Sequence, residues 1–358
     1  MPHGYRDRNV KRLRRYTGLT HAHALQLLKD RAGRMPRIAE SAGPERLLEA
    51  LVFEHLGGDV DYFAHPIGIS SVIPRHDSLV ISLDASSTRH GYPLVAHTLE
   101  RLLPAELPEA EQKQGDVRVI GVPGIRTTRA GREGLRLSLA GTKASVILTC
   151  NGSTNWADLL ADRQEQLEAA EYRPCWNEAE MTPPERAFHQ DHAEMSRVIE
   201  DASWLPSGLL RRSGLFHELS TAYCTRYWST WDQWRIELKH DLGIKPPHDA
   251  FIDHLTDPKW GMSLAVDKLH CECDAPWADP HYDRQCTVEL SSPTSRPGEL
   301  QVRFRAMGTW FNSYDTYRDL KRTGAAPAWL MRVMPRHHQS EPRQLRTGSG
   351  PLTTPDGC

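Results

Sequence analysis

The chain has 358 residues, of which 39% are hydrophobic and 25% are charged, a composition typical of a water-soluble globular protein with two or three domains. No segment approaches the roughly 18 consecutive apolar residues that a membrane helix requires. The N-terminus is basic but has no apolar stretch behind it, which excludes a secretory signal.

The cysteines and the arginines indicate where the protein works. Seven cysteines at irregular spacing, an odd number, favour reduced thiols in a cytoplasm over a framework of disulfides. Arginine outnumbers lysine by 35 to 9, a bias that indicates a GC-rich bacterial genome. We therefore expect a bacterial, cytoplasmic protein.

Charge is segregated along the chain, although the formal net charge is only −2. Residues 1–37 contain ten basic and two acidic residues, whereas residues 153–201 contain twelve acidic and four basic ones. Separation of this size is typical of a protein with a polyanionic partner, or of one whose charged segments dock on each other. The sequence leaves both interpretations open.

Composition also predicts the domain boundaries. All ten tryptophans lie at or after Trp156, and the first half is built from aliphatic residues. We expect a basic leader over residues 1–18 and an α+β domain over residues 19–150. A Trp-rich, mainly helical domain with a β-hairpin is expected over residues 151–334. Residues 335–358, rich in Pro, Gly, Ser and Thr, are expected to be disordered.

The first half alternates between helical and strand patterns. Thr20 is a suitable N-cap and Pro44 a suitable first helical residue, while Leu79, Ile81 and Leu83 alternate as in a half-buried strand. Helices are expected over residues 20–31, 44–56 and 92–103, and strands over residues 67–69, 79–83, 117–122, 135–139 and 146–149. This order predicts an antiparallel sheet covered on one face by helices.

The second half shows mainly helical periodicity. Trp228, Trp231 and Trp234 recur at three-residue steps, which predicts the packed face of a long helix rather than a platform for stacking bases. Helices are expected over residues 156–167, 215–242, 249–270 and 314–321, and paired strands over residues 288–290 and 300–307.

The strongest chemical motif is a cluster of histidines and cysteines. Zinc in proteins takes four thiolate or imidazole ligands in a tetrahedron, and three cysteines with one histidine from a short loop would supply them. The candidate ligands are His270, Cys271, Cys273, His281 and Cys286. A structural zinc is expected rather than a catalytic one, because four protein ligands leave no open position. The alternative is a loop whose cysteines pack as small apolar side chains beneath Trp277.

Two further segments are candidates for binding anions. Basic side chains in the leader can contact phosphates of a nucleic acid, or else form a solvated segment; they are Lys11, Arg12, Arg14 and Arg15. A polar loop after the strand at residues 79–83 leads into a helix, where an anion can bind the helix N-terminus. Its candidate ligands are Asp84, Ser86, Ser87, Arg89 and His90, for which turn and capping roles are the alternative.

Three functions follow from these features. The first is an accessory protein that binds an anionic partner, nucleic acid above all, through its basic N-terminal segment. The second is a metal-dependent or anion-handling enzyme that uses the loop at residues 84–90 or the cluster at residues 270–286. The third is a scaffold whose acidic segment at residues 153–201 docks on another protein or on the basic leader.

Overall fold

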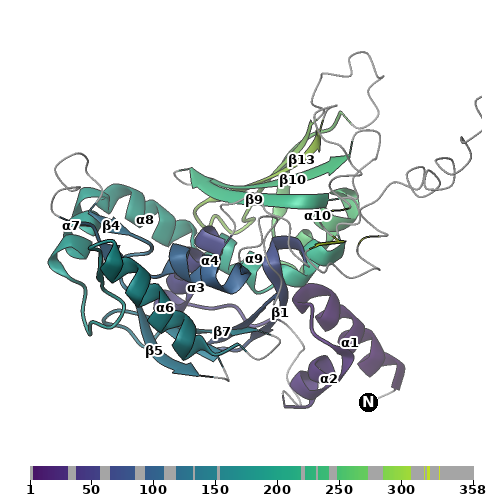
Figure 1. Ribbon diagram of the computed structural model, residues 1–358. Helices are drawn as coiled ribbons and strands as arrows, with labels where there is room; N and C mark the ends of the chain where they lie inside the picture. The colour runs from purple at the N-terminus through teal and green to yellow at the C-terminus, as the bar shows by residue number, and fades with distance from the viewer. Residues whose placement is uncertain are drawn as a thin grey trace, which may run out of the picture.

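Two five-stranded sheets lie on either side of a layer of helices in the computed structural model of the chain (Figure 1). The structure describes residues 3–30, 38–56, 65–84, 93–108, 118–131, 134–150, 154–218, 222–230, 233–241, 248–272 and 285–307, together with residues 318, 321, 322 and 330. Only residues 318 and 321 of the helix predicted over residues 314–321 are therefore described. The predicted disordered tail, residues 335–358, lies wholly outside the described residues.

The first sheet is mixed. Its strands, in spatial order, are β1 (Ile69–Pro74), β2 (Leu79–Leu83), β7 (Ser145–Cys150), β6 (Gly134–Leu139) and β5 (Ile125–Gly131). The hairpins β1–β2 and β6–β7 are antiparallel, as the sequence predicts, but β2 and β7 are parallel. The prediction of a purely antiparallel sheet is therefore wrong. The long segment between β2 and β7, which includes a helix, provides the crossover that parallel neighbours need.

Helices cover one face of this sheet. Leu135, Leu137 and Leu139 of β6 are buried while the residues between them are partly exposed, so one face of the strand points into the core. Helix α3 (Gly43–Leu56) contacts β6 and β7 on that face, and α4 (Leu94–Leu102) packs beside α3. Both helices agree closely with the prediction.

The second sheet replaces a predicted helix. Its strands, in spatial order, are β11 (Ala265–His270), β12 (Gln285–Ser291), β13 (Glu299–Met307), β10 (Gln233–Asp241) and β9 (Ala222–Thr230). The helix predicted over residues 215–242 is wrong, because Trp234, Ile236 and Leu238 are buried at the two-residue period of a strand. In the described residues, this half, expected to be mainly helical with a β-hairpin, combines helices with a five-stranded sheet.

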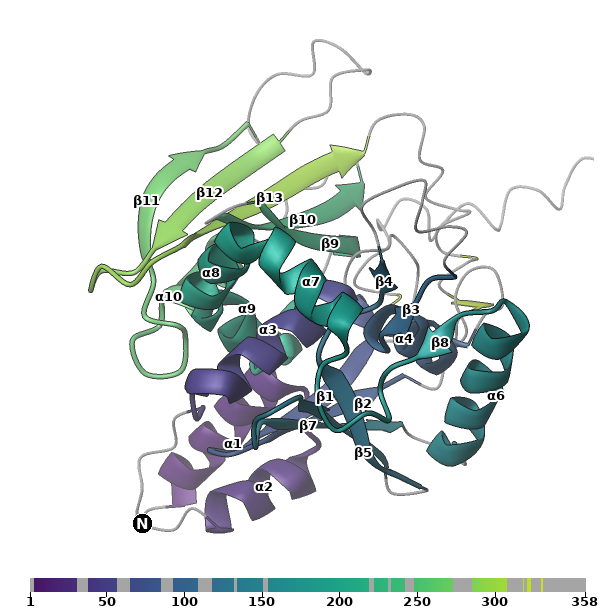
Figure 2. The ribbon, with the colours of Figure 1, turned by 90° about the vertical axis from the view of Figure 1, so that its left-hand side faces the viewer.

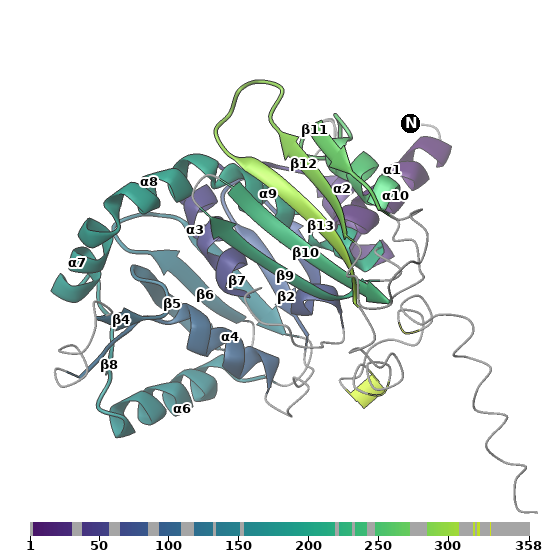
Figure 3. The ribbon, with the colours of Figure 1, turned by 90° about the horizontal axis from the view of Figure 1, so that it is seen from above.

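The rest of the second half agrees with the prediction in part. The helix expected over residues 249–270 is divided, because α10 (His248–Thr256) ends early and β11 follows it. The strands expected at residues 288–290 and 300–307 are confirmed as the antiparallel pair β12–β13. In Figure 3 the outer face of this sheet points toward the viewer, with α10 near β11 and β12.

The remaining elements lie around the two sheets, apart from α9, which lies beside α3 in the layer between them (Figure 2). They are α1 (His3–Thr17), α2 (His21–Asp30), α6 (Trp156–Ala169), α7 (Pro183–Asp191), α8 (Ala193–Ala202), α9 (Trp204–Leu210), the 3-10 turns η1 (Pro66–Gly68) and η2 (Ser213–Glu218), and a small sheet of β4 (Val119–Ile120), β3 (Ala105–Glu106) and β8 (Arg173–Pro174). Buried apolar side chains form one contiguous cluster from Val10 in α1 to Phe304 in β13. No helix among the described residues combines the length and the apolar character needed to span a bilayer.

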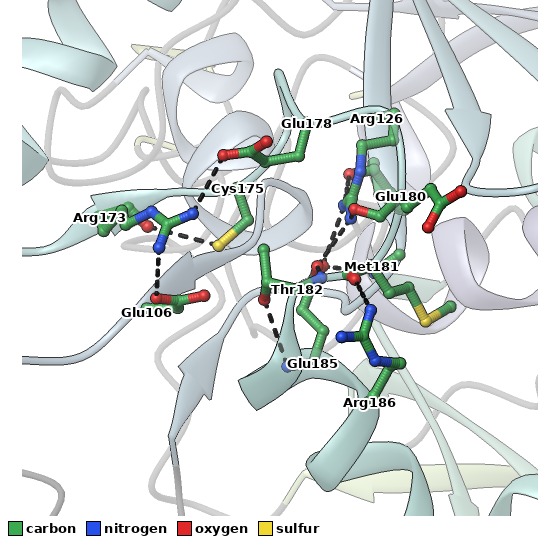
Figure 4. A network of polar contacts seen from close by, with 12 residues as sticks. Glu106, Arg126, Arg173, Cys175, Glu178, Glu180, Met181, Thr182, Glu185 and Arg186 are labelled. Carbon is green, nitrogen blue, oxygen red and sulfur yellow. Dashed lines mark hydrogen bonds and ion pairs between the residues drawn. The ribbon is translucent and has the colours of Figure 1, made fainter.

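Two buried ion pairs connect elements that are distant in sequence. Arg211, directly after α9, pairs with Glu49 of α3 in the central layer. Arg126 of β5 pairs with Glu185 of α7 at 2.7 Å, and Glu185 also closes the capping box of α7 with Thr182 (Figure 4). Both side chains of each pair are buried. Each pair therefore fixes one helix against the element that carries its partner, α3 against the end of α9 and α7 against β5.

Candidate metal centre

Three potential metal ligands converge beneath one end of the second sheet. The Nε2 atom of His248 lies 3.4 Å from the Sγ atom of Cys271, and that sulfur lies 3.4 Å from the Sγ atom of Cys286. The three ligand atoms all lie within 4.8 Å of one another. His248 and Cys286 are almost fully buried, at 4% and 3% exposed, whereas Cys271 is exposed.

The strand register explains why the two sulfurs meet. β11 and β12 are antiparallel, and His270 pairs with Thr287 at the last position of the ladder. One step further along this register, Cys271 lies opposite Cys286. Cys286 alternates with Val288 and Leu290 on the buried face of β12, so its sulfur points toward the core.

The helix α10 provides the third ligand. His248 is the first residue of α10, and its ring lies against Phe304, with the ring centroids 5.8 Å apart. Its Nδ1 atom lies 2.6 Å from a carboxylate oxygen of Asp249. This contact holds a proton on Nδ1 and leaves the lone pair of Nε2 directed toward the two sulfurs. Histidines that bind metals are oriented in the same way by a carboxylate.

Two of the three separations come close to those of a tetrahedral zinc ion. Zn–S bonds of about 2.3 Å and Zn–N bonds of about 2.0–2.1 Å place two sulfurs about 3.8 Å apart and a sulfur and a nitrogen about 3.6 Å apart. The separations of 3.4 Å from the Cys271 sulfur to each of the other two ligand atoms differ from these values by only a few tenths of an ångström. The third separation, between Nε2 of His248 and Sγ of Cys286, is within 4.8 Å. The group formed by His248, Cys271 and Cys286 can therefore hold a metal ion.

Among the described residues, the cluster differs from the predicted ligand set in its histidine, which is His248 and not His270. Cys271 and Cys286, two of the predicted ligands, lie close to each other. His270 does not join them, because it lies on the exposed edge strand β11 and its Nε2 atom contacts Glu272 at 3.1 Å. Cys273 and His281 lie outside the described residues.

His248 takes the place expected for His270, and sequence reasoning missed it because it belongs to a different element, 23 residues before Cys271.

The polar loop after β2 is described only at its first residue. Asp84 is buried, and its two carboxylate oxygens accept hydrogen bonds from the backbone N–H and the ring Nδ1 of His65, at 2.7 and 2.5 Å. Asp84 therefore orients a histidine that precedes β1. The other predicted ligands, Ser86, Ser87, Arg89 and His90, lie outside the described residues.

The basic N-terminal segment forms the ordered helix α1. Val10, Leu13 and Tyr16 are buried on one side of this helix. Lys11 and Arg12 are exposed on the other side and form no ion pair with any carboxylate that the structure describes. Arg14 is also exposed and donates to the carbonyl of Leu19, and Arg15 is half-buried. The predicted phosphate contacts therefore lie on one side of a fixed helix.

The acidic segment lies away from this helix. α6 and α7, which carry much of the negative charge, lie on the opposite side of the molecule from α1 in two perpendicular views (Figures 1 and 3). α1 contacts α2, β1 and η2 instead. In the part of the chain that the structure describes, α6 and α7 therefore do not cover the basic face of α1.

Comparison with known proteins adds no relative. No protein-family model, curated protein or solved structure matches the chain at a significant level. Function is therefore inferred from the chemistry of the chain's own residues.

Proposed function

We propose that this protein binds one zinc ion through His248, Cys271 and Cys286, and that the ion ties the β11–β12 hairpin to α10. The support is the convergence of two thiols and one imidazole within 4.8 Å, with Asp249 orienting the imidazole. Thiolate ligands favour zinc over the hard cations magnesium and calcium, which take oxygen ligands. A reducing cytoplasm, the location that we also propose, keeps such thiols available.

The role we propose for the ion is structural. Two of the three ligands are buried beneath the sheet, where an ion would stabilise the packing of α10 against the second sheet. The sequence offers Cys273 and His281 for the fourth position, and four protein ligands would leave no site for a substrate. The enzyme interpretation would instead need an open position on the ion.

Zinc content is the test. The full chain, purified without chelators, is expected to hold about one zinc per molecule by elemental mass spectrometry. His248→Ala, Cys271→Ser and Cys286→Ser are each expected to lose most of the zinc. His270→Ala and Cys150→Ser are the matched controls, since neither residue belongs to the cluster, and both are expected to retain it. Less than about a tenth of an equivalent in the wild-type protein would overturn the proposal.

A second proposed function is binding of nucleic acid by the basic face of α1. It is supported by Lys11 and Arg12, which are exposed on an anchored helix. Each phosphate that a basic side chain neutralises releases counterions, so binding should weaken steeply with salt.

The double variant Lys11→Gln/Arg12→Gln tests this second function. Its binding to labelled duplex DNA is expected to weaken, and the slope of log K against log salt to become shallower by about 0.9 for each phosphate that is no longer neutralised. Lys143→Gln, an exposed lysine beside the first sheet, is the matched control. An unchanged slope in the double variant would exclude the basic face of α1 as the binding surface.

A further inference from the structure

The same two sulfurs that would hold the metal are also placed to react with each other. Cys271 and Cys286 lie opposite each other at the end of an antiparallel strand pair, with their Sγ atoms 3.4 Å apart. Directly opposed residues of antiparallel strands have Cα atoms about 4.5–5.5 Å apart, within the range that a disulfide spans. Both side chains are reduced thiols in the structure.

The two cysteines differ in access to solvent. Cys271 follows β11, the edge strand of the second sheet, in which Val266 to His270 are all exposed. Cys286 is only 3% exposed, on the neighbouring strand. A small oxidant in solution therefore meets Cys271 first, and the buried Cys286 lies next to it as the second thiol.

We propose that Cys271 and Cys286 form a peroxide-sensitive pair whose oxidation to a disulfide releases the metal. The Cys271 thiolate attacks one oxygen of hydrogen peroxide, the O–O bond breaks, and a sulfenic acid forms while the leaving hydroxide takes up a proton to become water. The Cys286 sulfur then attacks the sulfenic sulfur, and a second water leaves. Overall, two thiols lose two electrons and two protons, and one peroxide becomes two waters.

Metal binding and the disulfide exclude each other. A disulfide holds its sulfurs about 2.0 Å apart, whereas a tetrahedral zinc ion needs them about 3.8 Å apart and both as thiolates. Oxidation therefore removes two ligands in one step and leaves His248 alone among the three described ligands. This inference extends the proposed zinc site, and its release step depends on that site.

Other described cysteines provide an internal comparison. Burial raises the pKa of Cys175 to about 12, and burial also raises the pKa of Cys150. Their thiols stay protonated near neutral pH and react slowly, because the thiolate is the nucleophile. Neither belongs to the cluster at His248. Peroxide should therefore oxidise the pair before it oxidises Cys150 or Cys175.

The test treats the zinc-loaded full chain with hydrogen peroxide and follows three quantities. These are zinc release with a chromogenic chelator, the loss of two hydrogen atoms by intact mass, and the position of the disulfide by peptide mapping. We expect one zinc released for each Cys271–Cys286 disulfide formed, and recovery of zinc binding after dithiothreitol. Cys150→Ser is expected to behave as the wild-type protein does, and Cys271→Ser to form no disulfide at Cys286.

His248→Ala separates the two proposals, since it lacks an expected zinc ligand but keeps both sulfurs. This variant is expected to form the disulfide faster, because no metal protects the thiolates. If the wild-type protein binds zinc and peroxide forms no Cys271–Cys286 disulfide, or forms a different one, the switch is overturned and the zinc site stands. If the disulfide forms in a protein that never holds zinc, the zinc site fails and the release step fails with it.

Discussion

Arg211 and Glu49 form a doubly hydrogen-bonded ion pair in which neither side chain is exposed to solvent. Nε of Arg211 donates to one carboxylate oxygen at 2.8 Å, and an Nη atom donates to the other at 2.6 Å. The guanidinium also donates to the carbonyls of Ala39 and Arg75, and the hydroxyl of Ser207 donates to Glu49. One pair therefore connects α3, the end of α9 and the turn after β1.

Removal of the guanidinium should destabilise the fold strongly. Arg211→Met leaves the Glu49 carboxylate buried without a counter-ion and two carbonyls without a donor, so we expect a loss of about 3–5 kcal/mol in the free energy of unfolding. Urea unfolding followed by circular dichroism measures the change. Arg173→Met is the control, because Arg173 is 59% exposed and its pairs with Glu178 and Glu106 are open to solvent on the arginine side, where each such pair contributes less than about 1 kcal/mol. Equal effects of the two substitutions would contradict the role of burial.

The pair between Arg126 and Glu185 should make stability depend on acid. Burial raises the pKa of Glu185, but hydrogen bonds from Arg126, Gly124 and Thr182 outweigh burial and leave that pKa below its ordinary value. A carboxyl whose pKa is lowered by folding stabilises the protein above its unfolded pKa of about 4.3, and this contribution is lost as the pH falls through the folded pKa.

Glu185→Gln tests this dependence. The stability difference between the wild-type protein and the variant should be largest near neutral pH and should shrink as the pH falls from about 5 toward about 3. Urea unfolding at a series of pH values measures it. A difference that stays constant over this range would show that the charge of Glu185 contributes nothing.

The orientation of His248 gives a prediction about metal affinity. Asp249→Asn keeps the size of the side chain but removes the charge that holds the proton on Nδ1 of His248. Loss of such a partner weakens metal binding by about 10–100-fold. Competition with a chelator of known affinity measures the change. Asp253→Asn, on the same helix, is the matched control and should bind zinc as the wild-type protein does.

Local patterns in the sequence predicted local structure well. The helices over residues 44–56 and 92–103 and the hairpins β1–β2 and β6–β7 follow from apolar periodicity and turn residues. The parallel pairing of Leu79 with Val146 does not follow from local patterns, because it joins strands that are far apart in the chain. The three-residue recurrence of Trp228, Trp231 and Trp234 predicts a helix where β9 and β10 form. The strand period appears only in the burial of Trp234, Ile236 and Leu238.

The candidate metal ligands also divide into those that local sequence patterns predict and those that only the tertiary structure brings in. The proximity of Cys271 and Cys286 in sequence indicates that they can share a ligand set, and the β11–β12 register brings them together. His248 carried no local signal, since only the packing of α10 beneath the sheet places it there. The position of His270 beside Cys271 also makes it a candidate, but successive residues of a strand point to opposite faces.

X-ray absorption spectroscopy at the zinc edge tests the central claim most directly. For the zinc-loaded full chain, a ligand shell with at least two sulfurs at about 2.3 Å and at least one nitrogen at about 2.0–2.1 Å is expected, and the sulfur contribution should fall in Cys271→Ser. A shell of oxygen and nitrogen alone, or one that is unchanged in Cys271→Ser, would contradict a centre built on His248, Cys271 and Cys286.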